Sequence, residues 1–222
     1  MDLIDGYRRF RRGYYQSNKG HFERLATQGQ RPRAMIIGCS DARVDPAFTF
    51  DTEPGDVFMV RNVANIVPPY MPDGDYHGTS AALEFAVRFL EVPHIVVLGH
   101  AQCGGIAALL RQGGSGVATD FIEPWMSIVS TARETALAIA HECGHAPDAP
   151  ETHRLCEQEG IRASLANLLT FPWIAQRVEA GQLQIHGWYF DIPSGTLSVL
   201  GADSRFAAVP AEDDAAPAPP SP

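Results

Sequence analysis

The sequence predicts an α/β domain in which helices flank a central, mainly parallel β-sheet with an antiparallel edge strand, preceded by an N-terminal helical arm. Short apolar runs that end in glycine alternate with longer segments of helical periodicity. The 222 residues, of which 45% are hydrophobic and 19% charged, can bury one sizeable core. We expect a basic helical arm over 1–33, the α/β domain over 34–208 and a disordered tail rich in Pro, Ala and acidic residues over 209–222.

Hydrophobic periodicity assigns the elements of the first half of the chain. Strands are recognised as short apolar runs bounded by glycine, and helices by apolar spacing of three to four residues. The expected elements, in order, are helices over 2–15 and 20–28, strands over 34–37 and 57–60, a helix over 79–90 and a strand over 94–98.

The second half of the chain is predicted to be mostly helical before it returns to the sheet. Long helical patterns cover 123–141 and 152–170, and residues 182–192 and 196–200 form a closing pair of strands. The last fourteen residues contain five prolines together with alanine and acidic residues. Such a composition cannot bury enough apolar surface to order itself, which is why we exclude it from the fold.

Charge separates the arm from the rest of the chain. Residues 1–33 carry eight basic and three acidic side chains, although the whole chain has a formal net charge of −9. The acidic body disfavours nucleic acid as a partner, and we expect the arm to lie on the body of a second subunit. No apolar run approaches the roughly 20 residues that span a bilayer, so we expect no membrane partner and a cytoplasmic protein with reduced thiols.

Metal-binding side chains follow two of the predicted strands. Cys39 comes directly after Ile36-Ile37-Gly38, and His100 after Val97-Leu98-Gly99, with Cys103 three residues further on. Because parallel strands place their carboxyl ends at one edge of a sheet, we expect these three side chains to converge. Two thiolates and an imidazole favour zinc, and three protein ligands leave a fourth position open for water or substrate. The sequence therefore predicts a catalytic zinc site.

The cluster Cys39-Ser40-Asp41-Ala42-Arg43 leaves two alternatives open. If Asp41 pairs with Arg43, the carboxylate stays ionised and the fourth zinc position remains open. If Asp41 binds the metal instead, the site is closed. A second metal-like pattern, His141-Glu142-Cys143-Gly144-His145, matches the zinc-peptidase motif H-E-x-x-H. We reject it because Gly144 and Pro147 place it at a helix end without a third ligand.

Together these motifs make the chain similar to β-class carbonic anhydrases, particularly the plant-like branch. The resemblance covers about residues 30 to 200. It rests on Cys39-Ser40-Asp41-Ala42-Arg43, Gly99-His100-Ala101-Gln102-Cys103-Gly104-Gly105, Pro54-Gly55-Asp56-Val57-Phe58, Arg61-Asn62-Val63-Ala64-Asn65 and His186-Gly187-Trp188.

The resemblance implies a lyase that hydrates carbon dioxide reversibly to bicarbonate and a proton through a zinc-bound hydroxide. It implies one Zn²⁺ per chain on Cys39, His100 and Cys103, a catalytic dyad of Asp41 and Arg43, and a homodimer or dimer-based higher oligomer. The implied substrate-binding residues are Gln30, Phe58, Val63, Phe85 and Gly104. The alternatives are a carbonyl sulfide or carbon disulfide hydrolase on the same fold and, less favoured, a non-catalytic zinc-binding protein.

The sequence departs from the family pattern at three positions. Phe85 stands where plant-like enzymes commonly have a tyrosine. One branch of the family closes its zinc site when bicarbonate occupies a pocket of Trp, Arg and Tyr, and here the matching positions are Ile36, Arg61 and Phe190. Because Ile36 and Phe190 offer no hydrogen-bond donor, we expect this trap not to form and the site to stay open.

Overall fold

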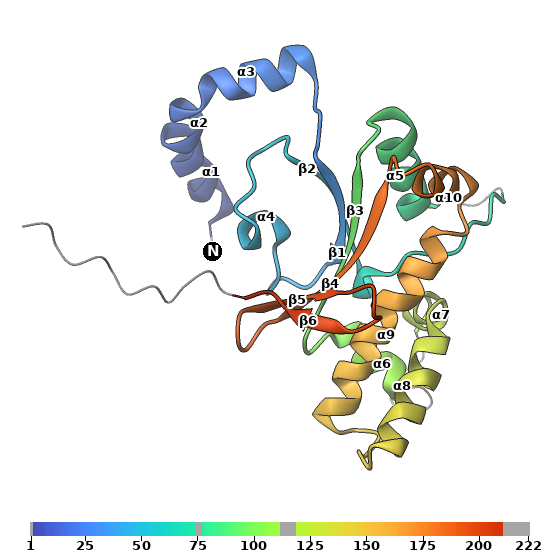
Figure 1. Ribbon diagram of the computed structural model, residues 1–222. Coiled ribbons are helices and arrows are strands. Elements are labelled where there is room, and N and C mark those ends of the chain that lie inside the picture. Colours follow the sequence, from blue (N-terminus) through green and yellow to red (C-terminus); the bar gives the residue numbers. More distant parts are fainter. Residues whose placement is uncertain (1, 74–76, 112–118, 211–222) are drawn as a thin grey trace, which may run out of the picture.

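The computed structural model describes residues 2–73, 77–111 and 119–210, and its centre is a six-stranded sheet (Figure 1). The strand order is β2-β1-β3-β4-β5-β6. Strands β1 to β4 run parallel to one another, whereas β5 and β6 are antiparallel. The strands are β1 (Ala34–Cys39), β2 (Val57–Asn62), β3 (His94–His100), β4 (Gln184–Asp191), β5 (Thr196–Leu200) and β6 (Phe206–Ala208). This confirms the predicted mainly parallel sheet with an antiparallel edge.

Helices pack against the sheet and against one another. Helix α9 lies against β3 and β4, and α8 packs along α9 (Figure 1). The helices of the body are α4 (Pro46–Thr49), α5 (Gly78–Glu84), α6 (Gly104–Leu110), α7 (Ile122–Ser127), α8 (Ser130–Glu142), α9 (Pro150–Leu168) and α10 (Pro172–Glu179). Within the described parts of the chain, no helix is both long and apolar enough to cross a membrane.

Close packing of α9 on the sheet depends on glycine. A Cβ at Gly99 would lie 2.7 Å from Ile161 Cδ1, and one at Gly187 would lie 2.9 Å from Ile161 Cγ2. Real Cβ atoms do not approach so closely, so only glycine lets Ile161 sit directly on β3 and β4. Helix α9 is thereby held against the strand that ends at His100.

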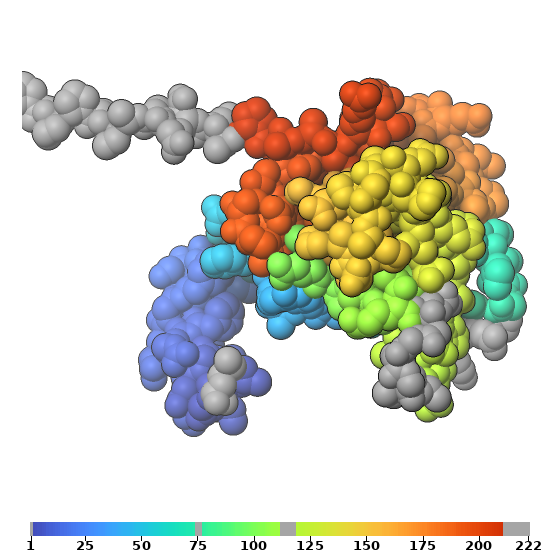
Figure 2. All heavy atoms as spheres, turned by 90° about the horizontal axis from the view of Figure 1, so that it is seen from below, coloured from blue at the N-terminus to red at the C-terminus, as the bar shows by residue number. Residues whose placement is uncertain are grey.

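The N-terminal arm is helical, as predicted, and projects from the body. It consists of α1 (Leu3–Arg12), α2 (Tyr14–Ser17) and α3 (Lys19–Gln28). None of the residues of these three helices, all of which the structure describes, is buried. In Figure 2 the arm, in blue, stands out from the body with open space beside it. Several large apolar side chains of the arm, among them Leu3, Ile4 and Tyr7, are therefore exposed to solvent.

Several elements differ from their predicted form. The helix expected over 79–90 is α5 followed by a π-helical turn over Phe85–Phe89, and the helix expected over 123–141 is interrupted between α7 and α8. Four further elements, α4, α6, α10 and β6, were not predicted from the sequence. Elements of three to eight residues contain too few turns or alternations to show a clear period. The expected disorder of the tail concerns mainly residues 211–222, which lie outside the described residues.

Candidate metal centre

Three metal-binding side chains meet at the carboxyl edge of the parallel sheet. Cys39 ends β1, His100 ends the adjacent strand β3, and Cys103 precedes α6. Their candidate ligand atoms lie within 4.8 Å of one another, and all three residues are buried. Because β1 and β3 are parallel neighbours, Cys39 and His100 meet in space although they lie 61 positions apart in the sequence.

The imidazole of His100 is oriented to present one nitrogen to this group. Its Nδ1 donates to the carbonyl oxygen of Ala101 at 2.8 Å, since a carbonyl can only accept. The lone pair of Nε2 is then free, and Nε2 is a buried atom without a hydrogen-bond partner among the described residues. A buried nitrogen with no partner beside two thiols is the arrangement that a metal ion would satisfy.

Negative charge is favoured on the sulfur of Cys39 and disfavoured on the sulfur of Cys103. The hydrogen bond from the Cys103 thiol, together with His100, lowers the pKa of Cys39. The same hydrogen bond raises the pKa of Cys103, because the first thiolate disfavours a second one beside it. Hydrogen bonds from the backbone N–H groups of Gly105 and Ile106, at the start of α6, partly offset this increase in the pKa of Cys103. Two soft sulfur ligands and one imidazole fit zinc, whose charge would stabilise both thiolates.

Asp41 is paired with Arg43 beside the three ligands. Arg43 Nη2 donates to Asp41 Oδ2 at 2.7 Å, and Arg43 Nε donates to Oδ1 at 2.9 Å. These hydrogen bonds hold the pKa of Asp41 well below its usual range. Asp41 Oδ2 also lies 3.9 Å from His100 Nε2. The carboxylate is therefore beside the metal group, which consists of Cys39, His100 and Cys103. Of the two alternatives left open by the sequence, the structure has the pair with Arg43.

Arg61 holds the loop that carries Asp41. Its Nε donates to the carbonyl oxygen of Cys39 at 2.9 Å, and its Nη2 donates to the carbonyl oxygens of Asp41 and Val44, each at 2.7 Å. Asp45 Oδ2 lies 3.4 Å from the remaining nitrogen, Nη1. One guanidinium therefore fixes the backbone on both sides of the dyad. This role of Arg61 cannot be predicted from the sequence, because no local pattern indicates which carbonyls an arginine will reach.

Two of the implied substrate-binding residues lie beside the metal group. Val63 follows the residue paired with Cys39 in the sheet, and the next residue, Ala64, donates its backbone N–H to the Cys39 sulfur. The Val63 side chain is 40% exposed. Gly104 follows Cys103 directly, is exposed and has open space where a Cβ would stand.

The other three implied substrate-binding residues lie away from the metal group of their own chain. Phe58 pairs with Met35, four residues before Cys39, which puts it about 13 Å along the sheet from the edge. Phe58 stacks on Phe85, which is 43% exposed. Gln30 is exposed in the segment after α3. A single chain therefore does not bring Gln30, Phe58 and Phe85 to its own metal group.

The rejected H-E-x-x-H pattern lies at the end of α8, with its histidines exposed. Gly144 has φ +74°, a left-handed conformation that ends the helix within the motif. Across residues 2–73, 77–111 and 119–210, the only group of three candidate metal ligands is Cys39, His100 and Cys103. His141 and His145 belong to no such group.

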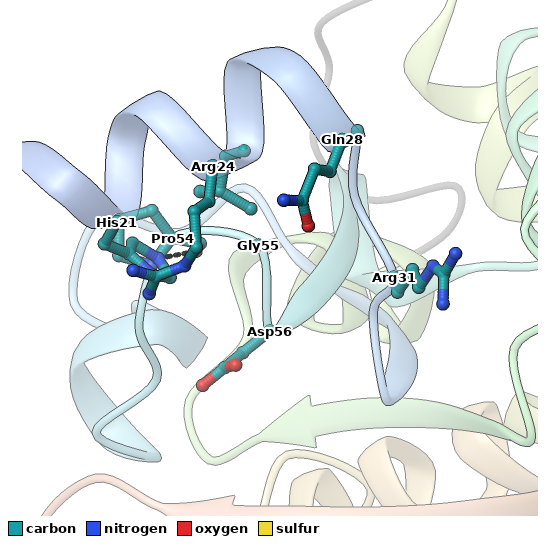
Figure 3. Close-up of a pocket in the computed structure, with 9 residues that line it drawn as sticks. His21, Arg24, Gln28, Arg31, Pro54, Gly55 and Asp56 are labelled. Carbon is teal, nitrogen blue, oxygen red and sulfur yellow. Dashed lines mark hydrogen bonds between the residues drawn. The ribbon is translucent and has the colours of Figure 1, made fainter.

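A polar cavity of about 340 Å³ lies far from these ligands, between α3 and the loop before β2 (Figure 3). His21 Nε2 donates to the carbonyl oxygen of Pro54 at 2.7 Å, and Arg24 is turned toward His21. Arg31 points away from both (Figure 3). The cationic side chains thus do not converge on one point, and we assign no binding role to this cavity.

Known proteins resemble the chain over most of its length. The carbonic anhydrase family model matches residues 34–197. β carbonic anhydrase 5, a chloroplastic protein of Arabidopsis thaliana, is 37% identical over 91% of this chain, which spans only 65% of that relative. A carbonic anhydrase of Pseudomonas aeruginosa is 42% identical over 92% of this chain and 90% of its own length.

Solved structures with a similar fold are also β-carbonic anhydrases. The β-carbonic anhydrase CcaA superposes with a TM-score of 0.86 at 34% identity, covering 95% of this chain and 92% of its own. A tetrameric β-carbonic anhydrase of Sordaria macrospora gives a TM-score of 0.78 at 31% identity, covering 90% and 95%. Sequence, fold and the arrangement of two cysteines and a histidine lead to one conclusion: the chain belongs to the β-class carbonic anhydrase family, whose members are lyases.

Proposed function

We propose that this protein hydrates carbon dioxide reversibly to bicarbonate and a proton, with one zinc ion per chain held by Cys39, His100 and Cys103. The observation that carries the proposal is the position of the Asp41–Arg43 pair, whose carboxylate oxygen lies 3.9 Å from the free His100 nitrogen. A purely structural zinc site is closed by four protein ligands and has no use for an ion pair beside the metal. Membership of a carbonic anhydrase family supports the same reaction.

Zinc, when bound, lowers the pKa of a coordinated water toward about 7 and so provides a nucleophile near neutral pH. The protein prepares the site for this chemistry. The Ala101 carbonyl fixes the tautomer of His100, and backbone N–H groups stabilise the two thiolates. Asp41, ionised and held by Arg43, can only accept hydrogen bonds. It therefore accepts a hydrogen bond from the attacking water, and this contact directs the lone pair of the water oxygen toward carbon dioxide.

The substrate is apolar, and the expected pocket is partly apolar as well. Val63 supplies a hydrophobic wall, and Gly104, which has no side chain, leaves room beside Cys103. Gln30, Phe58 and Phe85 are exposed or partly exposed and lie away from their own metal group. We infer that they line the site of a second copy, which makes a homodimer, or an oligomer built from dimers, the working unit.

Stopped-flow measurement of CO₂ hydration on zinc-replete protein tests this function. We expect fast hydration that disappears when zinc is removed by a chelator and returns when zinc is added. Rates with carbon disulfide and carbonyl sulfide, measured on the same preparation, test the alternative hydrolase activity. A higher catalytic efficiency on either sulfur compound would contradict the proposal, as would full zinc content without CO₂ hydration. The cytoplasmic location stays a prediction of the sequence, to be tested by cell fractionation.

A further inference from the structure

Helix α9 carries a buried carboxylate directly behind the metal group. Glu157 is only 4% exposed, although an isolated charge in a protein interior is strongly disfavoured. The neighbouring inward-facing residues of α9 are small or apolar, among them Cys156, Gly160 and Ile161. The burial of Glu157 therefore requires specific hydrogen-bond partners.

Each carboxylate oxygen of Glu157 has such a partner. Oε1 accepts a hydrogen bond from the backbone N–H of Cys103 at 3.0 Å, and Oε2 accepts one from the hydroxyl of Tyr189 at 2.8 Å. Both bonds are buried. Tyr189 lies on β4 opposite Gly99, the residue before His100, so the carboxylate connects α9, β4 and the loop that carries Cys103.

The loop between His100 and Cys103 needs this support. Gln102 adopts φ +58°, a left-handed conformation that is unfavourable for a residue with a side chain. Cys103 stands before the first turn of α6, where its N–H has no partner within the helix. Glu157 provides the acceptor that this N–H would otherwise lack. The hydrogen bond fixes the backbone from which the Cys103 sulfur projects.

We propose that Glu157 is a positioning residue for the metal centre, holding Cys103 in the geometry that binds zinc, and that Tyr189 in turn orients Glu157. This inference rests on the proposed zinc site. It assigns to Glu157 no contact with substrate. Groups that orient metal ligands in this way typically change metal affinity by about 10- to 100-fold when they are altered.

A structural role alone would give a different result. A residue that only stabilises α9 would lower the stability of the metal-free and zinc-bound proteins equally, and zinc affinity would not change. A positioning residue stabilises mainly the arrangement that zinc binds, so its replacement must weaken zinc binding itself.

Zinc affinity, measured by competition with a chromogenic chelator, separates the two roles. Glu157→Gln is the main variant, because its amide oxygen can still accept from Cys103 while its NH₂ donates to the Tyr189 oxygen. It exchanges both hydrogen bonds to the carboxylate for hydrogen bonds of a neutral amide at nearly constant shape. Tyr189→Phe removes only the hydroxyl. Glu159→Gln is the matched control, since Glu159 lies on the same helix but pairs with Arg162.

We expect Glu157→Gln to bind zinc about 10-fold more weakly or worse, Tyr189→Phe to be weakened less, and Glu159→Gln to stay within twofold of the unaltered protein. The increase in Tm on zinc addition should be smaller for Glu157→Gln. Unchanged zinc affinity in both Glu157→Gln and Tyr189→Phe would overturn the inference. If the unaltered protein itself fails to bind zinc, the proposed metal centre is wrong, which is a separate result.

Discussion

Arg43 donates hydrogen bonds to both carboxylate oxygens of Asp41, from Nη2 at 2.7 Å and from Nε at 2.9 Å. The same Nη2 donates to the carbonyl oxygen of Gln102 at 2.8 Å, within the loop between two of the candidate zinc ligands. Arg43 therefore connects Asp41 to the loop that carries Cys103, in addition to forming the bidentate pair. Its geometry leaves Asp41 ionised and directed at the open side of the site.

Asp41→Asn should retain zinc and lose most of the CO₂ hydration rate. The amide presents N–H donors where the carboxylate only accepts, so the attacking water is no longer oriented. We expect kcat to fall by at least about 100-fold, a range consistent with losing one positioned catalytic group. Zinc content by atomic absorption and stopped-flow rates check this. Asp51→Asn, at an exposed aspartate, is the control, and an unchanged rate for Asp41→Asn would contradict the dyad.

The ligand set predicts that Cys39→Ser, His100→Ala and Cys103→Ser each lose zinc and activity, because two remaining ligands bind the ion too weakly. Zinc content after dialysis is the measurement. Cys143→Ser, which replaces an exposed cysteine outside the metal group, should keep full zinc occupancy. Full occupancy in any of the first three variants would show that the ligand set is wrong.

The N-terminal arm is expected to hold the dimer together. Its helices bury no residue within the chain, and Leu3 and Ile4 are exposed. Phe10, Tyr14, Tyr15 and Phe22 form an aromatic cluster on the arm. Deleting residues 1–28 should therefore give monomer or aggregate in sedimentation velocity. A matched deletion of residues 211–222 should leave the oligomer intact. A stable dimer without the arm would remove this role.

Bicarbonate should inhibit the enzyme, if at all, without cooperativity. Arg61 already donates to the carbonyl oxygens of Cys39, Asp41 and Val44. Ile36 and Phe190 offer no donor, so a bicarbonate at this position would lack partners at a cost of at least about 1 kcal/mol. Initial rates over a range of bicarbonate concentrations should follow a hyperbolic curve. Sigmoidal inhibition, or a crystal structure near pH 7.5 with Asp41 on the metal, would contradict the open site.

Stability should fall as the pH decreases below about 6.5, in part because of His186. Burial, followed by the charge of His94, lowers the pKa of His186 from the ordinary value of 6.5. The unfolded chain then takes up a proton before the folded protein does, so the contribution is complete above pH 6.5 and is lost as the pH falls through the folded pKa. Urea unfolding at pH 5.5 and 7.5 measures this difference.

His186→Gln should show a smaller loss of unfolding free energy between pH 7.5 and pH 5.5 than the unaltered protein. Its side chain cannot take up a proton in this range. His145→Gln, at an exposed histidine, provides the comparison. An equal pH dependence in the His186 variant and the unaltered protein would rule out this contribution.

The amino-acid sequence by itself determined the parallel sheet and the candidate ligands. Alternating apolar runs and helical periods are local signals, and β1 and β3 each end in glycine followed by Cys39 or His100. Because parallel strands share an edge, these local signals were enough to bring distant residues together. The proximity of Asp41 to Arg43 is also local, since only one residue separates them.

Only the tertiary structure decided which of these neighbours pair and which polar groups are buried. Asp41 could have turned to the metal or to Arg43, and the choice depends on Arg61 and Gln102, which come from other strands and loops. Glu157 and Glu159 lie two residues apart, and nothing in the local sequence indicates which of them is buried. Helix α9 turns Glu157 toward the Cys103 N–H, whereas Glu159 pairs with Arg162, because long-range packing sets which face of the helix meets the sheet.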